Sequence, residues 1–172
     1  PMALASADPK TFLRGYVATY LREEVQQEGL VRNLPGFSRF LEAASFTHAQ
    51  ILNVSAVSRE CQVDRKVVED YFSVLEDLLI SFTLPVFSKR AKRKLVKHRK
   101  FYFFDCGVFR AIRPKGPLDS PSEEEGPALE GLVVQEIRAL NSYLELDYEL
   151  FFWRTLQQKL EVDLVCYGPK GL

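Results

Sequence analysis

The sequence predicts an α+β protein, and three patterns support this fold class. From Arg65 onwards, apolar residues recur at spacings of three and four, which is typical of an amphipathic helix facing a core. Residues 81–85 and 101–104 are rich in aromatic and β-branched side chains, which favours strands. Between residues 160 and 167, apolar and acidic residues alternate with a period of two, which predicts a further strand.

The composition is that of an ordinary soluble globular protein. Of the 172 residues 47% are hydrophobic, and the formal net charge is zero, so no global charge draws the chain to nucleic acid or to a membrane. Three scattered cysteines form neither a disulfide framework nor a metal motif. We interpret them as buried thiols in a reducing compartment, and we expect a cytoplasmic protein. No apolar run reaches the roughly 18 residues of a membrane span, so we expect no membrane partner.

Two helices are expected in an N-terminal helical segment, residues 1–51. Asp8 and Pro9 open the first helix, which ends near Gly29. Leu34 and Pro35 lead into the second helix, whose buried face consists of Phe37, Phe40, Leu41 and Ala44. His48 follows, and we interpret it as a helix-end or solvent residue, because metal sites need clustered ligands.

A helix–turn–helix followed by a strand pair is expected in residues 52–117. Asn53 and Asp64 are suitable N-caps for two helices, and the first helix buries Val57 and Cys61. The strands 81–85 and 101–104 enclose a basic hairpin tip, and residues 95–96 begin the second strand. Helix, turn, helix and hairpin occur in this order in a winged helix.

This winged helix would present its second helix and its basic tip to nucleic acid. Each phosphate that the protein neutralises contributes about 0.9 to the salt dependence of binding to duplex DNA. The alternatives are a solvated turn whose charges protect an edge strand, and a winged helix that contacts protein. The predicted contacts are Arg65 and Lys66 on the helix, beside Glu69, and Lys89, Arg90, Lys92, Arg93, Lys94 and Lys97 at the tip, with Arg99 and Lys100 as further members.

The remaining residues, 118–172, predict a smaller α/β unit. A short helix over residues 108–112 precedes a segment, 114–127, that is rich in Pro, Gly, Ser and Glu and is predicted to be a mobile loop at a domain boundary. The next helix starts at Pro127, and strands 148–153 and 160–167 form a hairpin. The helix is expected to be buried through Leu129, Leu132, Val133, Val134, Ile137 and Leu140.

Three acidic residues of this unit are candidates for chemistry. Glu161 and Asp163 share one strand face, where they repel each other unless a cation or a basic side chain lies between them. A helix carboxylate such as Glu130 followed by a strand carboxylate forms the first part of a Mg²⁺-dependent phosphodiesterase site of the PD-(D/E)XK type. Glu130 and Asp163 are the candidate metal ligands, with Glu161 third. The acid-x-Lys strand of such a site is absent, so surface carboxylates on a scaffold are the alternative, and no catalytic residue is assigned.

Several motifs occur in an order that resembles a known family. They are residues 20–25 (Tyr-Leu-Arg-Glu-Glu-Val), 100–107, 128–136, and 152–155 followed by 160–165. Together they resemble the C-terminal domain, of unknown function, of prokaryotic predicted AAA+ superfamily ATP-binding proteins. The resemblance covers most of the chain. It implies a winged helix followed by a truncated restriction-endonuclease-like segment, in which Glu130 and Asp163 match the first two acidic positions.

Two parts of that family are missing from the chain, namely the ATPase module with its phosphate loop and the acid-x-Lys strand. The chain therefore looks like a piece of a longer protein. We expect an accessory fragment that binds nucleic acid through the winged helix and is not catalytic by itself. Its partners would be DNA and the missing ATPase module. The fragment would hold no cofactor, whereas the parent would use ATP and Mg²⁺. The alternatives are a Mg²⁺-dependent nuclease-like domain in the full-length protein and a protein-interaction or oligomerisation module.

Overall fold

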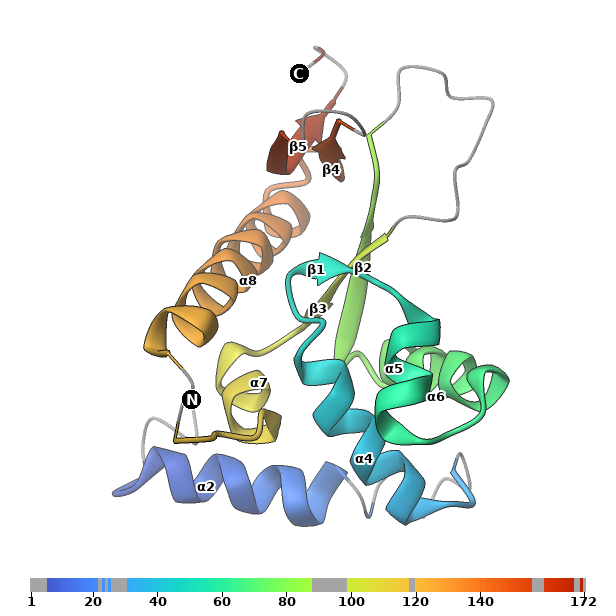
Figure 1. Ribbon diagram of the computed structural model, residues 1–172. Coiled ribbons are helices and arrows are strands. Elements are labelled where there is room, and N and C mark those ends of the chain that lie inside the picture. Colours follow the sequence, from blue (N-terminus) through green and yellow to red (C-terminus); the bar gives the residue numbers. More distant parts are fainter. Residues whose placement is uncertain are drawn as a thin grey trace.

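The computed structural model combines helices with two small sheets, which confirms the predicted α+β class (Figure 1). It describes residues 6–21, 23, 25, 31–87, 99–117, 120–155, 160–168 and 171. Within these residues, no helix combines the length and the apolar character that a membrane crossing requires.

The N-terminal helices begin where the sequence predicts. Helix α2 (Pro9–Gly15) is capped by Asp8, whose carboxylate accepts hydrogen bonds from the backbone N–H groups of Lys10 and Thr11 at 3.0 and 3.1 Å. It continues as a π-helical turn, η1 (Tyr16–Leu21). Helix α4 (Leu34–Ser45) buries the four predicted residues of its apolar face. The predicted helix end near Gly29 lies outside the described residues.

The middle of the chain forms two short helices and a three-stranded antiparallel sheet. Strand β1 (Gln50–Ile51) is followed by α5 (Val54–Cys61), α6 (Arg65–Asp77), β2 (Ser81–Pro85) and β3 (Arg99–Phe103). Asn53 and Asp64 cap the two helices as predicted. The strand order is β1-β3-β2, so β3 is the central strand. The predicted basic tip and the predicted strand start at residues 95–96 lie outside the described residues.

The central strand β3 separates two apolar cores. Phe101 and Phe103 point to one face of the sheet, where they pack with α4, α5 and α6 and with the following helix α7 (Cys106–Ile112). Tyr102 points to the other face, where it stacks on Phe82 of β2. This alternation follows from the two-residue period of a strand. Both faces of β3 are therefore covered.

The C-terminal unit packs on the second face of this sheet. Helix α8 (Pro121–Tyr143) runs along one side of the molecule and leads to the antiparallel pair β4 (Glu149–Arg154) and β5 (Glu161–Tyr167) (Figure 1). The chain just after β2 is hydrogen-bonded to β4, because the backbone N–H of Phe87 donates to the carbonyl of Phe152 at 2.6 Å. The two sheets are thus joined at the end of β2.

Two predictions for α8 are wrong. The helix begins at Pro121, with Ser120 as its N-cap, so residues 121–127 are helical and not a loop. Only a narrow side of small residues, Ala128, Gly131 and Val134, is buried. Four residues that we expected to be buried are exposed instead: Leu129, Leu132, Val133 and Leu140.

His48 is buried, which contradicts its interpretation as a solvent residue. Its ring stacks on Phe109 at 4.1 Å, and its Nδ1 atom accepts a hydrogen bond from the backbone N–H of Phe103 at 3.0 Å. Its Nε2 atom faces α8, where a Cβ atom on Gly131 would lie only 2.5 Å away. Burial lowers the pKa of His48 to about 4. Of the three cysteines, all free, only Cys61 is fully buried.

Candidate functional site

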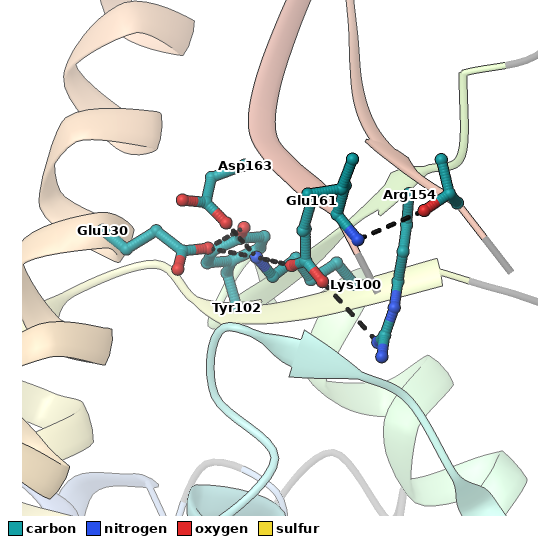
Figure 2. Close-up of polar contacts among 8 residues, drawn as sticks. Lys100, Tyr102, Glu130, Arg154, Glu161 and Asp163 are labelled. Atoms are coloured by element: carbon teal, nitrogen blue, oxygen red, sulfur yellow. Dashed lines mark hydrogen bonds and ion pairs between the residues drawn. The ribbon is translucent and has the colours of Figure 1, made fainter. Parts of the chain in front are cut away.

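The most concentrated group of charged side chains among the described residues surrounds Lys100. Its Nζ atom donates to Glu161 Oε1 at 2.6 Å and to Asp163 Oδ1 at 2.8 Å, and it lies 2.7 Å from Glu130 Oε1. Figure 2 shows these three carboxylates converging on the ammonium group. We call these four residues, together with Tyr102, the Lys100 cluster. It joins residues that are up to 63 positions apart in the sequence.

The local structure explains how each side chain reaches the cluster. Lys100 and Tyr102 are two positions apart on β3, so both point away from the core formed by Phe101. Glu161 and Asp163 share a face of β5 for the same reason. Glu130 extends from α8, and its Oε1 atom also accepts a hydrogen bond from the Tyr102 hydroxyl at 2.6 Å. Three elements therefore meet at a single ammonium group.

The lysine of the cluster is buried, whereas its acidic side chains are partly exposed. The side chain of Lys100 is 2% exposed, whereas Glu130 is 22% and Asp163 is 58% exposed. Burial on its own would lower the pKa of Lys100, but the hydrogen bonds with Asp163, Glu130 and Glu161 outweigh it and raise the pKa. Burial and the bond to Glu130 also raise the pKa of Tyr102. Lys100 is therefore charged, and Tyr102 is a neutral hydrogen-bond donor.

The expectation of a cation or basic side chain between Glu161 and Asp163 is met by Lys100. Placing Lys100 in the phosphate-contacting set is wrong, because its ammonium group is buried among carboxylates. Arg99, the preceding residue, is exposed. A lysine inside an aromatic strand covered on both faces requires acidic partners. That signal was present in the sequence and could have identified Lys100.

The cluster as arranged does not fit Mg²⁺. A divalent cation would bind through the carboxylates of Glu130, Glu161 and Asp163, and one oxygen of each already lies within 2.8 Å of the Lys100 ammonium nitrogen. A metal ion would also be repelled by the charge of Lys100. Metal binding by Glu130 and Asp163 therefore stays a prediction for the longer protein. A cleavage assay of the longer protein with Asp163→Ala tests this hypothesis, and an unchanged cleavage rate would exclude it.

The predicted nucleic-acid contacts are only partly described. Arg65 and Lys66 are exposed at the start of α6, and Arg65 Nε forms an ion pair with Glu69 at 3.0 Å. Helix α6 carries two basic and four acidic residues, and the acidic ones are Glu69, Asp70, Glu76 and Asp77. Its acidic excess opposes phosphate binding by this helix. The other predicted contacts, Lys89, Arg90, Lys92, Arg93, Lys94 and Lys97, lie outside the described residues.

The fold and the Lys100 cluster define a mixed helix-and-sheet protein in which a three-stranded and a two-stranded sheet are joined around a buried lysine. The chain belongs to the family described as a domain of unknown function, DUF8612, whose model matches residues 1–119. A second domain of unknown function, DUF4143, matches residues 125–172. Lys100 and Tyr102 thus lie in the first matched region, and the three carboxylates lie in the second.

Two proteins that are similar to this chain come from mycobacteria. The chain is 28% identical over 167 residues to Uncharacterized protein Rv2008c of Mycobacterium tuberculosis and, equally, to Uncharacterized protein Mb2031c of Mycobacterium bovis. The matches cover 94% of this chain but 36% of each relative, so the chain spans about a third of their length. No solved structure matches the chain significantly.

Proposed function

We propose that this chain is an accessory, non-catalytic part of a longer protein, and that it docks on another part of that protein through the outer face of α8. The observation that carries the proposal is a row of exposed apolar residues along this helix and its C-cap residue. Their exposure ranges from 47% at Val133 to 84% at Tyr143. We call this row the α8 stripe, and its members are Leu129, Leu132, Val133, Leu140, Tyr143 and Leu144.

The spacing of the stripe makes it one surface. With about 100° per residue in an α-helix, its six members fall within about 60° of a single line along α8. Apolar surface of this extent on a soluble protein marks an interaction site. In Figure 1, α8 lies at the side of the molecule, and every member of the stripe is exposed. The described part of the chain therefore leaves this face without a partner element.

The charge on the stripe favours a different segment over a second copy of the same helix. Glu136 is exposed in the middle of the stripe. If two copies of α8 paired antiparallel with their stripes in register, the two Glu136 carboxylates would meet, and like charges repel. The complementary surface is an apolar face with a Lys or Arg at its centre.

The length of the relatives supports an intramolecular partner, because about two thirds of their sequence lies outside the matched region. The resemblance to C-terminal domains of predicted AAA+ ATP-binding proteins supports the ATPase module as that partner. The surface that we assign to this contact is the α8 stripe, and not the predicted winged helix.

The test is binding of this chain to the separately produced N-terminal part of the longer protein, measured by calorimetry. We expect the double substitution L132S/L140S to weaken binding at least tenfold. The matched control is L79S, which replaces an equally apolar residue, 78% exposed, at the end of α6. Equal affinities for the two variants would refute the proposal, and so would a dimer of the chain in sedimentation that L132S/L140S disrupts.

Nucleic-acid binding through the basic segment is a second candidate. Residues 89–97 contain six of the 23 Lys and Arg residues and no acidic residue, so the rest of the chain is acidic. The segment connects β2 to β3, and the order helix, strand, helix, helix, strand, strand supports a winged helix whose wing it would form. The acidic excess of α6 favours contacts with phosphates through the segment over reading of base edges by the helix.

Fluorescence anisotropy of a labelled DNA duplex at two salt concentrations tests this candidate. We expect binding to weaken as salt rises, and we expect K92A/R93A/K94A to lower the slope of log affinity against log salt by about 3. The control R65A/K66A should change the slope less. Binding that is insensitive to salt, or that survives the triple substitution, would count against it.

A further inference from the structure

We propose that a cavity at the opposite end of α8 from β4 and β5 binds a small organic anion. The cavity has a volume of about 580 Å³ and lies between α2, α7 and the start of α8. Small-molecule sites usually enclose roughly 300–1,000 Å³. Five basic residues line it: Lys10, Arg14, Arg110, Arg113 and Lys115. This inference is independent of the α8 stripe and of the basic segment.

The charge of the lining favours an anion. Five basic and three acidic residues line the cavity, the acidic ones being Glu123, Glu124 and Glu125, so the lining has a positive excess although the whole chain is neutral. Lys10 and Arg14 are four positions apart on the helical segment α2, so they share a face. Within the described residues, neither forms an ion pair within 4 Å. Their charges are therefore available to a ligand.

Glu124 shows where an anionic group would lie. Its side chain is 17% exposed, and its carboxylate pairs with Arg110 Nε at 3.2 Å and with Lys115 Nζ at 2.7 Å. One carboxylate thus occupies the position between two cations on the wall of the cavity. Glu124 would compete with a phosphate or carboxylate of a ligand for the same two partners.

The rest of the lining defines the body of the ligand. Pro9, Leu13, Ala111 and Pro114 contribute apolar surface between the charged groups. A surface of this kind suits a ring or a short hydrocarbon portion. The chemical class is therefore a small molecule with one or more phosphate groups on a partly apolar body, of which a mononucleotide is the simplest probe.

Isothermal titration of the chain with AMP, with inorganic phosphate as a second probe, tests the proposal. We expect E124Q to bind AMP at least fivefold more tightly than the wild type, because it removes the competing carboxylate. R14Q and K10Q should each bind at least threefold more weakly. Thermal melting of every variant checks that the fold is retained.

The matched control is E123Q, which removes the same charge one residue away on the same wall. In the described residues Glu123 forms no ion pair, so its substitution should change the affinity for AMP less than twofold. Equal effects of E123Q and E124Q would reveal general charge attraction and overturn the proposal. Saturable binding of a DNA duplex but of neither small probe would overturn it as well.

Discussion

Lys100 connects β3 to α8 and β5, because its buried ammonium group is shared by three carboxylates from these elements. It follows a run of basic residues, and that context suggests an exposed phosphate contact. The strand period instead turns it towards α8 and β5, where three carboxylates surround it. Its partners lie 30 to 63 residues further along the chain, so no local pattern identifies them.

Replacing Lys100 by Met should destabilise the protein. The substitution keeps the apolar stem but leaves Glu130, Glu161 and Asp163 without their shared counter-charge. We expect the free energy of unfolding to fall by about 2 kcal/mol, less than for a fully buried pair because the acids are partly exposed. Urea denaturation measures this. R99M, at the exposed neighbour, is the control, and equal losses for both variants would contradict the role of the cluster.

His48 should make the stability depend on pH in the acidic range. Its pKa is lowered from 6.5 to about 4 by burial, so the unfolded chain binds a proton between these values and the folded chain does not. The stabilisation is complete above pH 6.5 and is lost as the pH falls towards 4, a change of about 3 kcal/mol.

The measurement is the free energy of unfolding from pH 7 to pH 4 for the wild type and for H48Q. Glutamine does not titrate, and its oxygen can still accept the hydrogen bond of the Phe103 N–H. Carboxylates titrate in both proteins, so only the difference between the two curves reports on His48. Parallel curves would show that His48 does not contribute.

At the scale of elements, the sequence predicts helix ends and buried faces well where they depend on residues close together in the chain. The caps Asp8, Asn53 and Asp64 mark three helix starts, because a side-chain oxygen bonds a nearby backbone N–H. The apolar face of α4 and the strands β2 and β3 also follow from residue type and period. The joining of the two sheets at Phe87 and Phe152 depends on distant residues, and nothing in the local sequence predicts it.

Helix α8 is where local reasoning fails, and the reasons are physical. Pro127 suggests a helix start, because its ring suits the first turn of a helix. The helix instead begins six residues earlier, at Pro121, where Ser120 is the N-cap. The large apolar residues of α8 suggest that they form its buried face. The buried residues are instead the small ones, Ala128, Gly131 and Val134. Gly131 permits this close approach, since the imidazole of His48 occupies the space of a Cβ atom.

Gly131→Ala should therefore be destabilising in spite of the higher helix propensity of alanine. The new Cβ atom would lie 2.5 Å from His48 Nε2, and relieving that overlap should cost roughly 1–3 kcal/mol. Gly126→Ala on the same helix is the control. No atom lies within 4 Å of its Cβ position, and we expect a change within about 0.5 kcal/mol, because crowding by the Pro127 ring offsets the gain in propensity. Thermal or urea unfolding compares the two variants.

At the scale of the whole molecule, the central strand β3 contributes to both apolar cores. Phe101 and Phe103 lie in one core, and Tyr102 lies in the other. Although two family models divide the chain near residue 120, this sharing predicts one cooperative unfolding transition. In differential scanning calorimetry, the van't Hoff and calorimetric enthalpies should agree. Two resolved transitions would show that the matched regions unfold separately.

The anchoring of the basic segment has a mechanical consequence. On its N-terminal side, Phe87 is hydrogen-bonded to the β4 residue Phe152. On its C-terminal side, Lys100 is held by Glu161 and Asp163 of β5. Both contacts involve the same hairpin, and Lys100 is also paired with Glu130 of α8, so a force applied to the segment between β2 and β3 would be transmitted to β4, β5 and α8. The C-terminal unit, and not the N-terminal helices, would therefore resist that force first.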